Sequence, residues 1–280
     1  RGSSSGSDLR SALRRRRTDR ANREVRAAGA RRFDHRRPTL SIAIENVDRV
    51  RVLRFARPER KHAITPAMYG ALADPLQPAA EDASGRGVVA PRRGEPPTRD
   101  DAPVFRFLRS IASFPKPLVA AVCGPAIGVG TTMLLHCDLV YAGENATLSL
   151  PFVHLGLCPE AASSLLLPAA VGYQRAAEKL LLGEPFGAAE AKEIGIVNRV
   201  LPAGEVEGFA LAQAAKLATR PISSLLATKA LMKRSFGGAV REQMIEEGRY
   251  FARMLGEPAA REAFSAFLEK RPADFSKVGA

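Results

Sequence analysis

The sequence lacks the features that mark a membrane-spanning or a disulfide-stabilised protein. No uninterrupted apolar run approaches the ~20 residues that a helix needs to cross a bilayer, so we expect no membrane span. The chain has only three cysteines, Cys123, Cys137 and Cys158. They are too few and too scattered for a disulfide framework or a cysteine-based metal site, and they fit a reduced compartment inside a cell. We therefore predict no bound metal.

Acidic residues are scarce at the start of the chain. Residues 1–37 hold 13 arginines against four acids, a net charge of +9, whereas the full chain of 280 residues carries +13. The rest of the chain is only +4, which is not typical of a nucleic-acid-binding protein, so we expect no nucleic-acid partner. Residues 1–37 also lack an apolar period, which predicts a disordered extension. A targeting segment and a basic arm that binds RNA or a membrane surface are the alternatives.

From about Leu40 onward, strand-like and helix-like apolar patterns alternate. The predicted strands lie at 41–45, 50–55, 118–123, 139–142, 146–150 and 196–201. The predicted helices lie at 66 to about 72 or 76, 103–114, 131–136, 161–182 with pauses at Pro168 and Gly172, 188–194, 206–219, 222–235, 239–255 and 258–270. This order indicates an α/β core over 38–202, with an irregular stretch at 81–102, followed by a helical region over 203–280.

The most informative stretch is KPLVAAVCGPAIGVGTTMLLHCD, residues 116–138. Its apolar start predicts a strand that is buried on both faces and broken at 124–125. Gly128, Val129 and Gly130 then form a predicted turn before a helix. Backbone N–H groups at such a turn can hold an oxyanion or a phosphate, and glycines let a ligand approach the main chain closely. A purely structural glycine-rich connection is the alternative that this pattern alone leaves open.

Charged residues in two loops are further candidates. Glu160 ends the loop PFVHLGLCPE (151–160) directly before a predicted helix, where the helix dipole alone can favour an acid. Arg60 and Lys61 lie in the polar loop RPERKHAIT (57–65). These basic side chains could meet the phosphates of a ligand, although basic residues in loops are more often simply solvated.

Together these motifs resemble the crotonase superfamily of enoyl-CoA hydratases and isomerases, from about Ser41 to Phe275. The resemblance is carried by RPERKHAIT (57–65), KPLVAAVCGPAIGVGTTMLLHCDLVYA (116–142), PFVHLGLCPEAASSLLLP (151–168), GAAEAKEIGIVNRVLP (187–202) and FLEKRPADF (267–275). It is most similar to Δ3,Δ2-enoyl-CoA isomerases. The resemblance implies a crotonase-like ββα spiral core with a C-terminal α-helical trimerisation region. It also implies an acyl-CoA substrate, a homotrimer or hexamer, and no cofactor apart from the CoA of the substrate.

The resemblance also implies roles for particular residues. The N–H of Val129, beside Gly128, forms the second half of an oxyanion hole for the thioester carbonyl. Glu160 stands where the isomerase base removes the proton α to that carbonyl and returns it at the γ carbon. Thr132 and Phe152 stand where hydratases carry the glutamates that activate water. These replacements favour an isomerase of fatty-acid metabolism and β-oxidation, with a hydratase-like protein as the alternative.

The loop with Arg60, Lys61 and Ala63 is similar to the CoA-contacting loop of the superfamily. We therefore expect these residues to bind CoA. The implied localisation is cytoplasmic, of a bacterial type, with organelle targeting by the arginine-rich segment as the alternative.

One departure from the superfamily concerns the first oxyanion donor. That donor comes from a pattern VVLxGxGxxFxAGxDL, and residues 85–94 of this chain do not show it. Losing one donor of an oxyanion hole commonly costs about 10²–10³ in rate. A catalytically impaired subunit is therefore a further alternative. A local shift of reading frame across roughly residues 85–100 would account for the departure, because codons for Ala-Pro-Arg-Arg-Gly read one base later can encode Leu-His-Gly-Ala-Gly.

Overall fold

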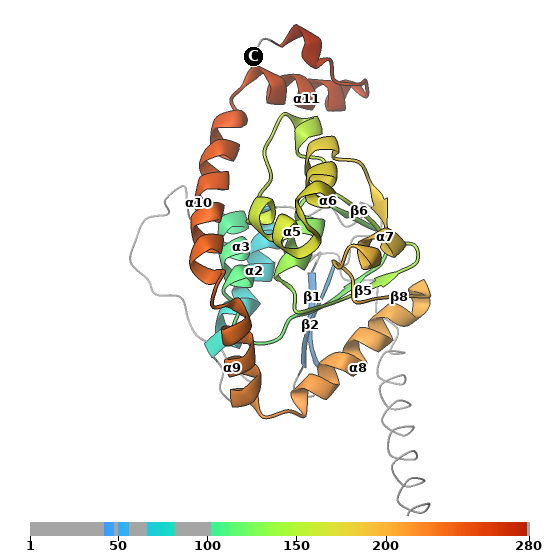
Figure 1. The fold of residues 1–280 in the computed structure, drawn as a ribbon, viewed down its shortest axis with the longest axis vertical. Helices are drawn as coiled ribbons and strands as arrows, with labels where there is room; N and C mark the ends of the chain where they lie inside the picture. Colours follow the sequence, from blue (N-terminus) through green and yellow to red (C-terminus); the bar gives the residue numbers. More distant parts are fainter. Residues whose placement is uncertain (1–41, 48–49, 56–65, 82–101, 279–280) are drawn as a thin grey trace, which may run out of the picture.

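The computed structural model describes residues 42–47, 50–55, 66–81 and 102–278 (Figure 1). The predictions for the extension 1–37, the CoA loop 57–65 and the departure at 85–100 lie outside these residues. The described part is a mixed α/β fold in which helices outnumber strands, which confirms the predicted class. None of its helices is long and apolar enough to cross a membrane.

The strands form three small sheets. The first is an antiparallel hairpin of β1 (Ile42–Val47) and β2 (Val50–Phe55), in register from Ile42 opposite Phe55 to Val47 opposite Val50. The second is parallel, in the order β3 (Val119–Val122), β5 (Leu139–Gly143), β8 (Arg199–Leu201). The third has the order β4 (Pro125–Ile127), β6 (Thr147–Ser149), β7 (Phe186–Gly187), with β4 parallel and β7 antiparallel to β6.

The chain winds between the second and third sheets. Strand β3 is followed by β4, β5 by β6, and β7 by β8, so each turn of the winding adds one strand to each sheet. The crossing from β3 to β4 is made at Gly124, whose φ of 73° is easily adopted only by glycine. The sequence predicted the break there but not β4, because Pro125 is tolerated in a strand only at special positions such as its first residue.

The prediction that 118–123 is buried on both faces is wrong. Ala121 is exposed, and the other three residues of β3 are only partly buried. Within the described residues β3 is the outermost strand of its sheet, with β5 on one side only. An all-apolar run therefore does not distinguish a central strand from one at an edge.

Helices surround these sheets and follow the predicted order. Their bounds are α2 (Pro66–Glu81), α3 (Pro103–Ala112), α4 (Val129–Thr132), η3 (Met133–His136), η4 (Val153–Leu155), α5 (Ser163–Val171), α6 (Tyr173–Ala177), η5 (Glu178–Leu182), α7 (Ala188–Glu193), η6 (Ala203–Glu205), α8 (Val206–Ala218), α9 (Ile222–Lys233), α10 (Gly237–Met254), α11 (Pro258–Glu269) and η7 (Phe275–Lys277). Helix α2 extends past its predicted end. The predicted pause at Gly172, whose φ is 85°, is confirmed, whereas the pause predicted at Pro168 is wrong because Pro168 lies inside α5.

Apolar burial holds the winding core together. Leu148, Leu150 and Leu167 are fully buried at its centre, where they pack with side chains of α5, α6 and α7. Each such side chain contributes about 1.5–3 kcal/mol relative to an exposed one. A second cluster joins α2 and α3 through residues such as Met68 and Phe107, and it reaches Ala161 in the loop before α5. The site described below therefore lies where these clusters meet.

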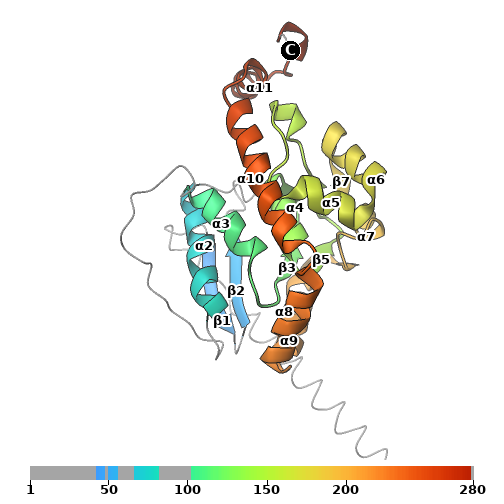
Figure 2. The same ribbon diagram turned by 60° about the vertical axis from the view of Figure 1, so that its left-hand side comes forward.

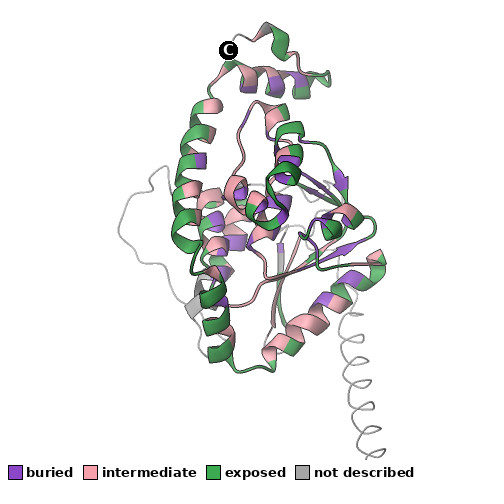
Figure 3. Ribbon diagram, viewed as in Figure 1, coloured by how far each residue is buried: buried purple, intermediate pink, exposed green. Residues whose placement is uncertain are grey.

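Helix α10 lies across both clusters, with α2 and α3 on one side of it and α5 to α7 on the other (Figure 2). Its Met244 packs against the α2–α3 cluster, and its Phe251 and Met254 pack against the central one. Helices α8 to α11 are nevertheless mostly exposed or half-buried, in contrast to β5 and β6 (Figure 3). The C-terminal helices thus form an outer layer that contacts the core along one face.

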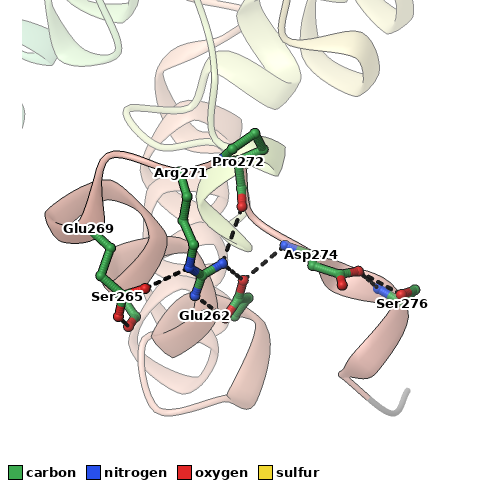
Figure 4. Close-up of polar contacts among 7 residues, drawn as sticks. All are labelled: Glu262, Ser265, Glu269, Arg271, Pro272, Asp274 and Ser276. Carbon is green, nitrogen blue, oxygen red and sulfur yellow. Dashed lines mark hydrogen bonds and ion pairs between the residues drawn. The ribbon is translucent and has the colours of Figure 1, made fainter.

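The motif FLEKRPADF (267–275) covers the end of α11 and the segment after it, and its polar contacts stabilise this outer layer. Arg271 pairs with both oxygens of Glu262 at 2.5 and 3.0 Å and with Glu269 at 2.6 Å (Figure 4). Glu262 also accepts the Asp274 N–H at 2.9 Å. The Arg271 guanidinium lowers the pKa of Glu262 to about 2. These contacts fold the segment after α11 back onto that helix.

Candidate active site

The glycine turn between β4 and α4 depends on Gly128. Its φ of 57° and ψ of −116° lie in a region that residues with a side chain rarely adopt. Its N–H donates to the Ser149 carbonyl at 2.9 Å, which ties the turn to β6. Its carbonyl accepts the N–H groups of Thr131 at 2.9 Å and Thr132 at 3.0 Å, so the helix begins at Val129, earlier than predicted.

The first N–H of this helix is available to a ligand. The Val129 N–H has no acceptor within the described residues, whereas the Gly128 N–H is already used. A Cβ added at Gly128 would meet no atom within 4 Å, so the main chain is open on that side. Thr131 holds the turn still, because its hydroxyl donates to the Ala126 carbonyl at 2.5 Å and accepts the Ser149 N–H at 3.2 Å. An oxyanion placed beside Val129 would therefore meet a preformed donor.

Glu160 lies against this turn although it is 28 residues from Thr132 in the sequence. Its Oε1 accepts a hydrogen bond from the Thr132 hydroxyl at 2.9 Å. The carboxyl is largely desolvated, and burial raises its pKa to about 7, with the Glu247 charge adding to the rise and the Thr132 bond opposing it. A carboxyl with such a pKa can take up and release a proton near neutral pH.

Apolar side chains account for this desolvation. Val129, Met133, Tyr69 and Ala161 belong to the same cluster, between α2, α4 and the loop after Glu160. Burial, with the nearby Glu160 charge, also raises the pKa of the Tyr69 phenol above its usual range. The carboxyl thus lies in surroundings that suit an apolar acyl chain.

The turn that follows Glu160 has an unusual backbone. Ala161 and Ala162 have φ of 60° and 56°, in the left-handed region. For residues with a Cβ this costs about 1–2 kcal/mol each. Because of this turn α5 begins at Ser163, two residues after the start predicted from sequence.

Side chains from distant segments hold the turn in place, and the sequence did not identify them as part of the site. The buried His136 Nε2 donates to the Ala161 carbonyl at 2.8 Å, and burial lowers its pKa to about 4, so the ring is neutral at pH 7. On the other side, Glu247 of α10 accepts the Ala162 N–H at 2.6 Å and the Ser164 N–H at 3.0 Å. His136 lies in the motif 116–142 without an assigned role, and Glu247, outside the motifs, lies more than 80 residues from its partners.

Comparison with known proteins agrees with this geometry. A sequence model of the enoyl-CoA hydratase/isomerase family matches residues 92–278. The chain belongs to this family. The crystal structure of an enoyl-CoA hydratase/isomerase from Pseudoalteromonas atlantica T6c superposes with a TM-score of 0.76 at 40% identity, covering 84% of this chain and 99% of that one. The crotonase-like fold predicted from sequence is thereby confirmed.

The curated relatives of this chain in the enoyl-CoA hydratase/isomerase family include proteins named as hydratases and proteins named as isomerases. The 2,3-dehydroadipyl-CoA hydratase of Escherichia coli K12 is 31% identical over 249 residues, covering 84% of this chain and 98% of the relative. Enoyl-CoA delta isomerase 2 of Rattus norvegicus is 34% identical over 240 residues, covering 78% of this chain but 61% of the relative. Similarity alone therefore does not separate isomerisation from hydration.

The structure brings only some of the predicted site residues together. Glu160, Thr132, Val129 and Gly128 meet at the glycine turn, whereas Phe152 is buried in the central core. Arg60, Lys61 and Ala63 lie outside the described residues. Across the part of the chain that the structure describes, no group of three or more His, Cys, Asp or Glu side chains is arranged to hold a metal ion.

Proposed function

We propose that the chain is an enzyme of fatty-acid metabolism that shifts the double bond of a 3-enoyl-CoA to position 2. The observation that carries this proposal is the desolvated carboxyl of Glu160, held by Thr132 at the turn where the Val129 N–H has no acceptor among the described residues. An acid and an oxyanion donor in one apolar site are what proton abstraction next to a thioester carbonyl requires.

The reaction moves one proton between two carbons. The Glu160 carboxylate takes the proton from the α carbon, and the electron pair of that C–H bond moves into a dienolate whose charge rests on the thioester oxygen. The Val129 N–H stabilises that oxygen. The protonated Glu160 then returns its proton to the γ carbon, the original double bond is lost, and the new one lies between the α and β carbons.

Thr132 can hold Glu160 in both protonation states. While Glu160 is a carboxylate, the Thr132 hydroxyl donates to it at 2.9 Å. The transferred proton is carried on the other carboxyl oxygen, so Oε1 can go on accepting the Thr132 hydroxyl once Glu160 is protonated. The acid therefore keeps its position throughout the proton transfer, which a shuttle between neighbouring carbons needs.

Among the residues that the structure describes, no second usable acid is found beside Glu160, which argues against hydration. Activating water in this superfamily takes a pair of glutamates, and here Thr132 is neutral while Phe152 is buried in the core. The nearest other carboxylate, Glu247, uses its oxygens for the N–H groups of Ala162 and Ser164. Nothing in this group is free to orient a water molecule against a 2-enoyl-CoA.

The proposal includes a homotrimer or hexamer in the cytoplasm, with CoA bound by Arg60, Lys61 and Ala63. Support for assembly comes from the apolar side chains that the C-terminal helices expose to solvent. Phe267 and Leu268 of α11 are 76% and 80% exposed, which is unusual for large apolar side chains on one helix. A second copy of the chain would cover them.

The deciding experiment compares purified protein on a 3-enoyl-CoA and on a 2-enoyl-CoA, with products separated by chromatography. Conversion of the first without hydration of the second is the expected result. Hydration of the 2-enoyl-CoA would overturn the proposal in favour of a hydratase. No turnover of either substrate, with acyl-CoA binding retained in calorimetry, would instead indicate the catalytically impaired subunit expected if the first oxyanion donor is missing.

A further inference from the structure

The backbone after Glu160 would not keep its shape by itself. Two consecutive alanines in the left-handed region persist only where surrounding contacts hold them. The direction of the Glu160 side chain follows from this backbone, because Ala161 is the next residue in the chain. Whatever holds the turn therefore also aims the base.

Several contacts that fix the turn and the start of α5 come from a single side chain of α10. Glu247 Oε2 accepts the Ala162 N–H at 2.6 Å, and its Oε1 accepts both the N–H and the hydroxyl of Ser164, at 3.0 and 2.5 Å. Gln243, one turn earlier on α10, donates to the Ser164 hydroxyl oxygen at 2.8 Å. Both carboxylate oxygens are needed, because the donors lie on either side of them.

Burying the Glu247 carboxylate costs free energy that an apolar side chain in a purely structural contact would not cost. Glu247 is 5% exposed, and no cation pairs with it among the residues that the structure describes. Burial raises its pKa, although its bonds to Ser164 and Ala162 oppose the rise. A buried carboxylate without a counter-ion is retained where its hydrogen bonds serve a purpose that an apolar residue cannot serve.

We propose that Glu247 is a positioning residue of the reaction, which reaches from the C-terminal helical layer to fix the Ala161–Ala162 turn and so aims Glu160 at the substrate. This inference rests on the proposed role of Glu160 as the base. Glu247 itself touches neither the substrate nor the transferred proton.

The titratable surroundings make the effect measurable. Among the described residues, the titratable groups that face Glu160 are Tyr69 from α2 and Glu247 from α10, and the Cys158 thiol faces Glu247. His136, on the far side of the turn, is neutral above pH 5 or so because its pKa is about 4. Removing the Glu247 charge therefore lowers the pKa of Glu160, and it also lowers the pKa of the Cys158 thiol, which the same charge raises.

The test compares Glu247→Gln and Glu247→Asp with the matched control Glu246→Gln. Glu246 is the exposed neighbour on α10 and pairs only with Arg249 at 3.2 Å. We expect kcat of Glu247→Gln to fall about 10²-fold with KM within about threefold, because a misaimed base slows chemistry rather than binding. The midpoint of its pH–rate profile moves to lower pH. Glu247→Asp keeps the charge but not the reach, so its kcat falls while the midpoint stays near that of the wild type.

Two further measurements keep the inference testable if these variants fold poorly. Ser164→Ala removes one donor and should lower kcat by a smaller factor with an unchanged midpoint. Carbon-13 NMR titration of glutamate carboxyls, with Glu160 assigned from its absence in Glu160→Gln, follows the Glu160 pKa without any turnover. Loss of thermal stability in Glu247→Gln with unchanged kcat and unchanged Glu160 titration would overturn the positioning role. Equal activity of Glu160→Gln and wild type would instead overturn the proposed function. The Glu160 titration would still show whether Glu247 acts on Glu160.

Discussion

The winding core and two of the C-terminal helices, α9 and α10, bury opposite kinds of residue. In the core, the fully buried side chains are mostly leucine and alanine, packed between the sheets and α5 to α7. The buried residue of α9 is Lys229 and that of α10 is Glu247, so both are charged. Large apolar side chains such as Phe267 on α11 are instead exposed to solvent. Apolar packing thus builds the core, whereas α9 and α10 add buried charged contacts to the apolar ones by which the outer layer meets it.

These buried charges make the outer layer part of the site's architecture. Lys229 donates to the Asp138 carboxylate at 2.6 Å and to the Lys116 carbonyl at 2.7 Å, at the two ends of the stretch that carries the glycine turn. Glu247 holds the turn after Glu160. Polar contacts of this kind depend on direction, so they position loops more precisely than apolar packing does.

The largest effect should come from the core side of this comparison. Glu160→Gln keeps an oxygen that can accept from Thr132 but removes the base, so isomerisation should fall by about 10³-fold or more. Acyl-CoA binding, measured by calorimetry, should persist. Because the folded-state pKa of about 7 lies above the ordinary value of 4.5, ionisation of Glu160 costs stability as pH rises through that window. The variant should therefore be more stable at pH 8, on the order of 1–3 kcal/mol. Unchanged turnover would remove Glu160 from the mechanism.

A second change tests whether buried charge anchors the outer layer. Lys229→Met leaves the mostly buried Asp138 without its cation, and we expect a loss of about 3 kcal/mol in the free energy of unfolding. Lys233→Met, one turn later, is the matched control. The pKa of Lys233 is lowered by burial and by the nearby Lys229 charge, so its loss should cost less than about 1 kcal/mol. Equal effects in urea unfolding would show that the Lys229–Asp138 pair is not special.

A smaller effect is expected at Thr132. Thr132→Val removes the donor that lowers the Glu160 pKa, so the pKa should rise above about 7 and activity at pH 7 should fall about tenfold. The wild-type rate should rise about tenfold per pH unit below pH 7 and level off above it, and the variant's profile should be displaced to higher pH. Thr132→Ser keeps the hydroxyl and serves as control. A profile that does not move in Thr132→Val would contradict the assigned hydrogen bond.

The smallest effect on turnover is expected at the exposed apolar face of α11. Phe267→Glu and Leu268→Glu should lower the assembly mass in light scattering while leaving the fold of each chain intact by circular dichroism. Leu181 of η5 is a comparably exposed apolar residue outside the C-terminal helices. Leu181→Glu should leave the mass of the assembly unchanged. A monomeric wild-type protein would show that this face has another purpose.

Much of the site was predictable because its residues lie in short sequence motifs. Gly128 was recognised from a Gly-x-Gly pattern between an apolar strand and a helix, and it needs a positive φ that only glycine adopts easily. Glu160 was recognised as a loop acid before a helix within a family motif. What the motif did not reveal was the pair of left-handed alanines after it, since alanine favours helix in isolation.

The remaining misses share one physical cause. The contacts of His136 and Glu247 with the turn join segments 25 to 85 residues apart, and no local pattern records such a distance. Strand β4 was missed because three residues beginning with proline carry no strand signal by themselves. Its place depends on β6, which pairs with it from 22 residues further along the chain.

The sequence by itself determined the family, the order of strands and helices apart from the short strands β4 and β7, and the residues that meet at the glycine turn, because these are properties of local patterns and motifs. Only the tertiary structure decided that Glu160 is desolvated, that the Val129 N–H is unused while the Gly128 N–H is not, and that Glu247 reaches the turn from α10. The reason is that desolvation and hydrogen-bond partnership depend on which segments pack together, and packing is a property of the whole chain.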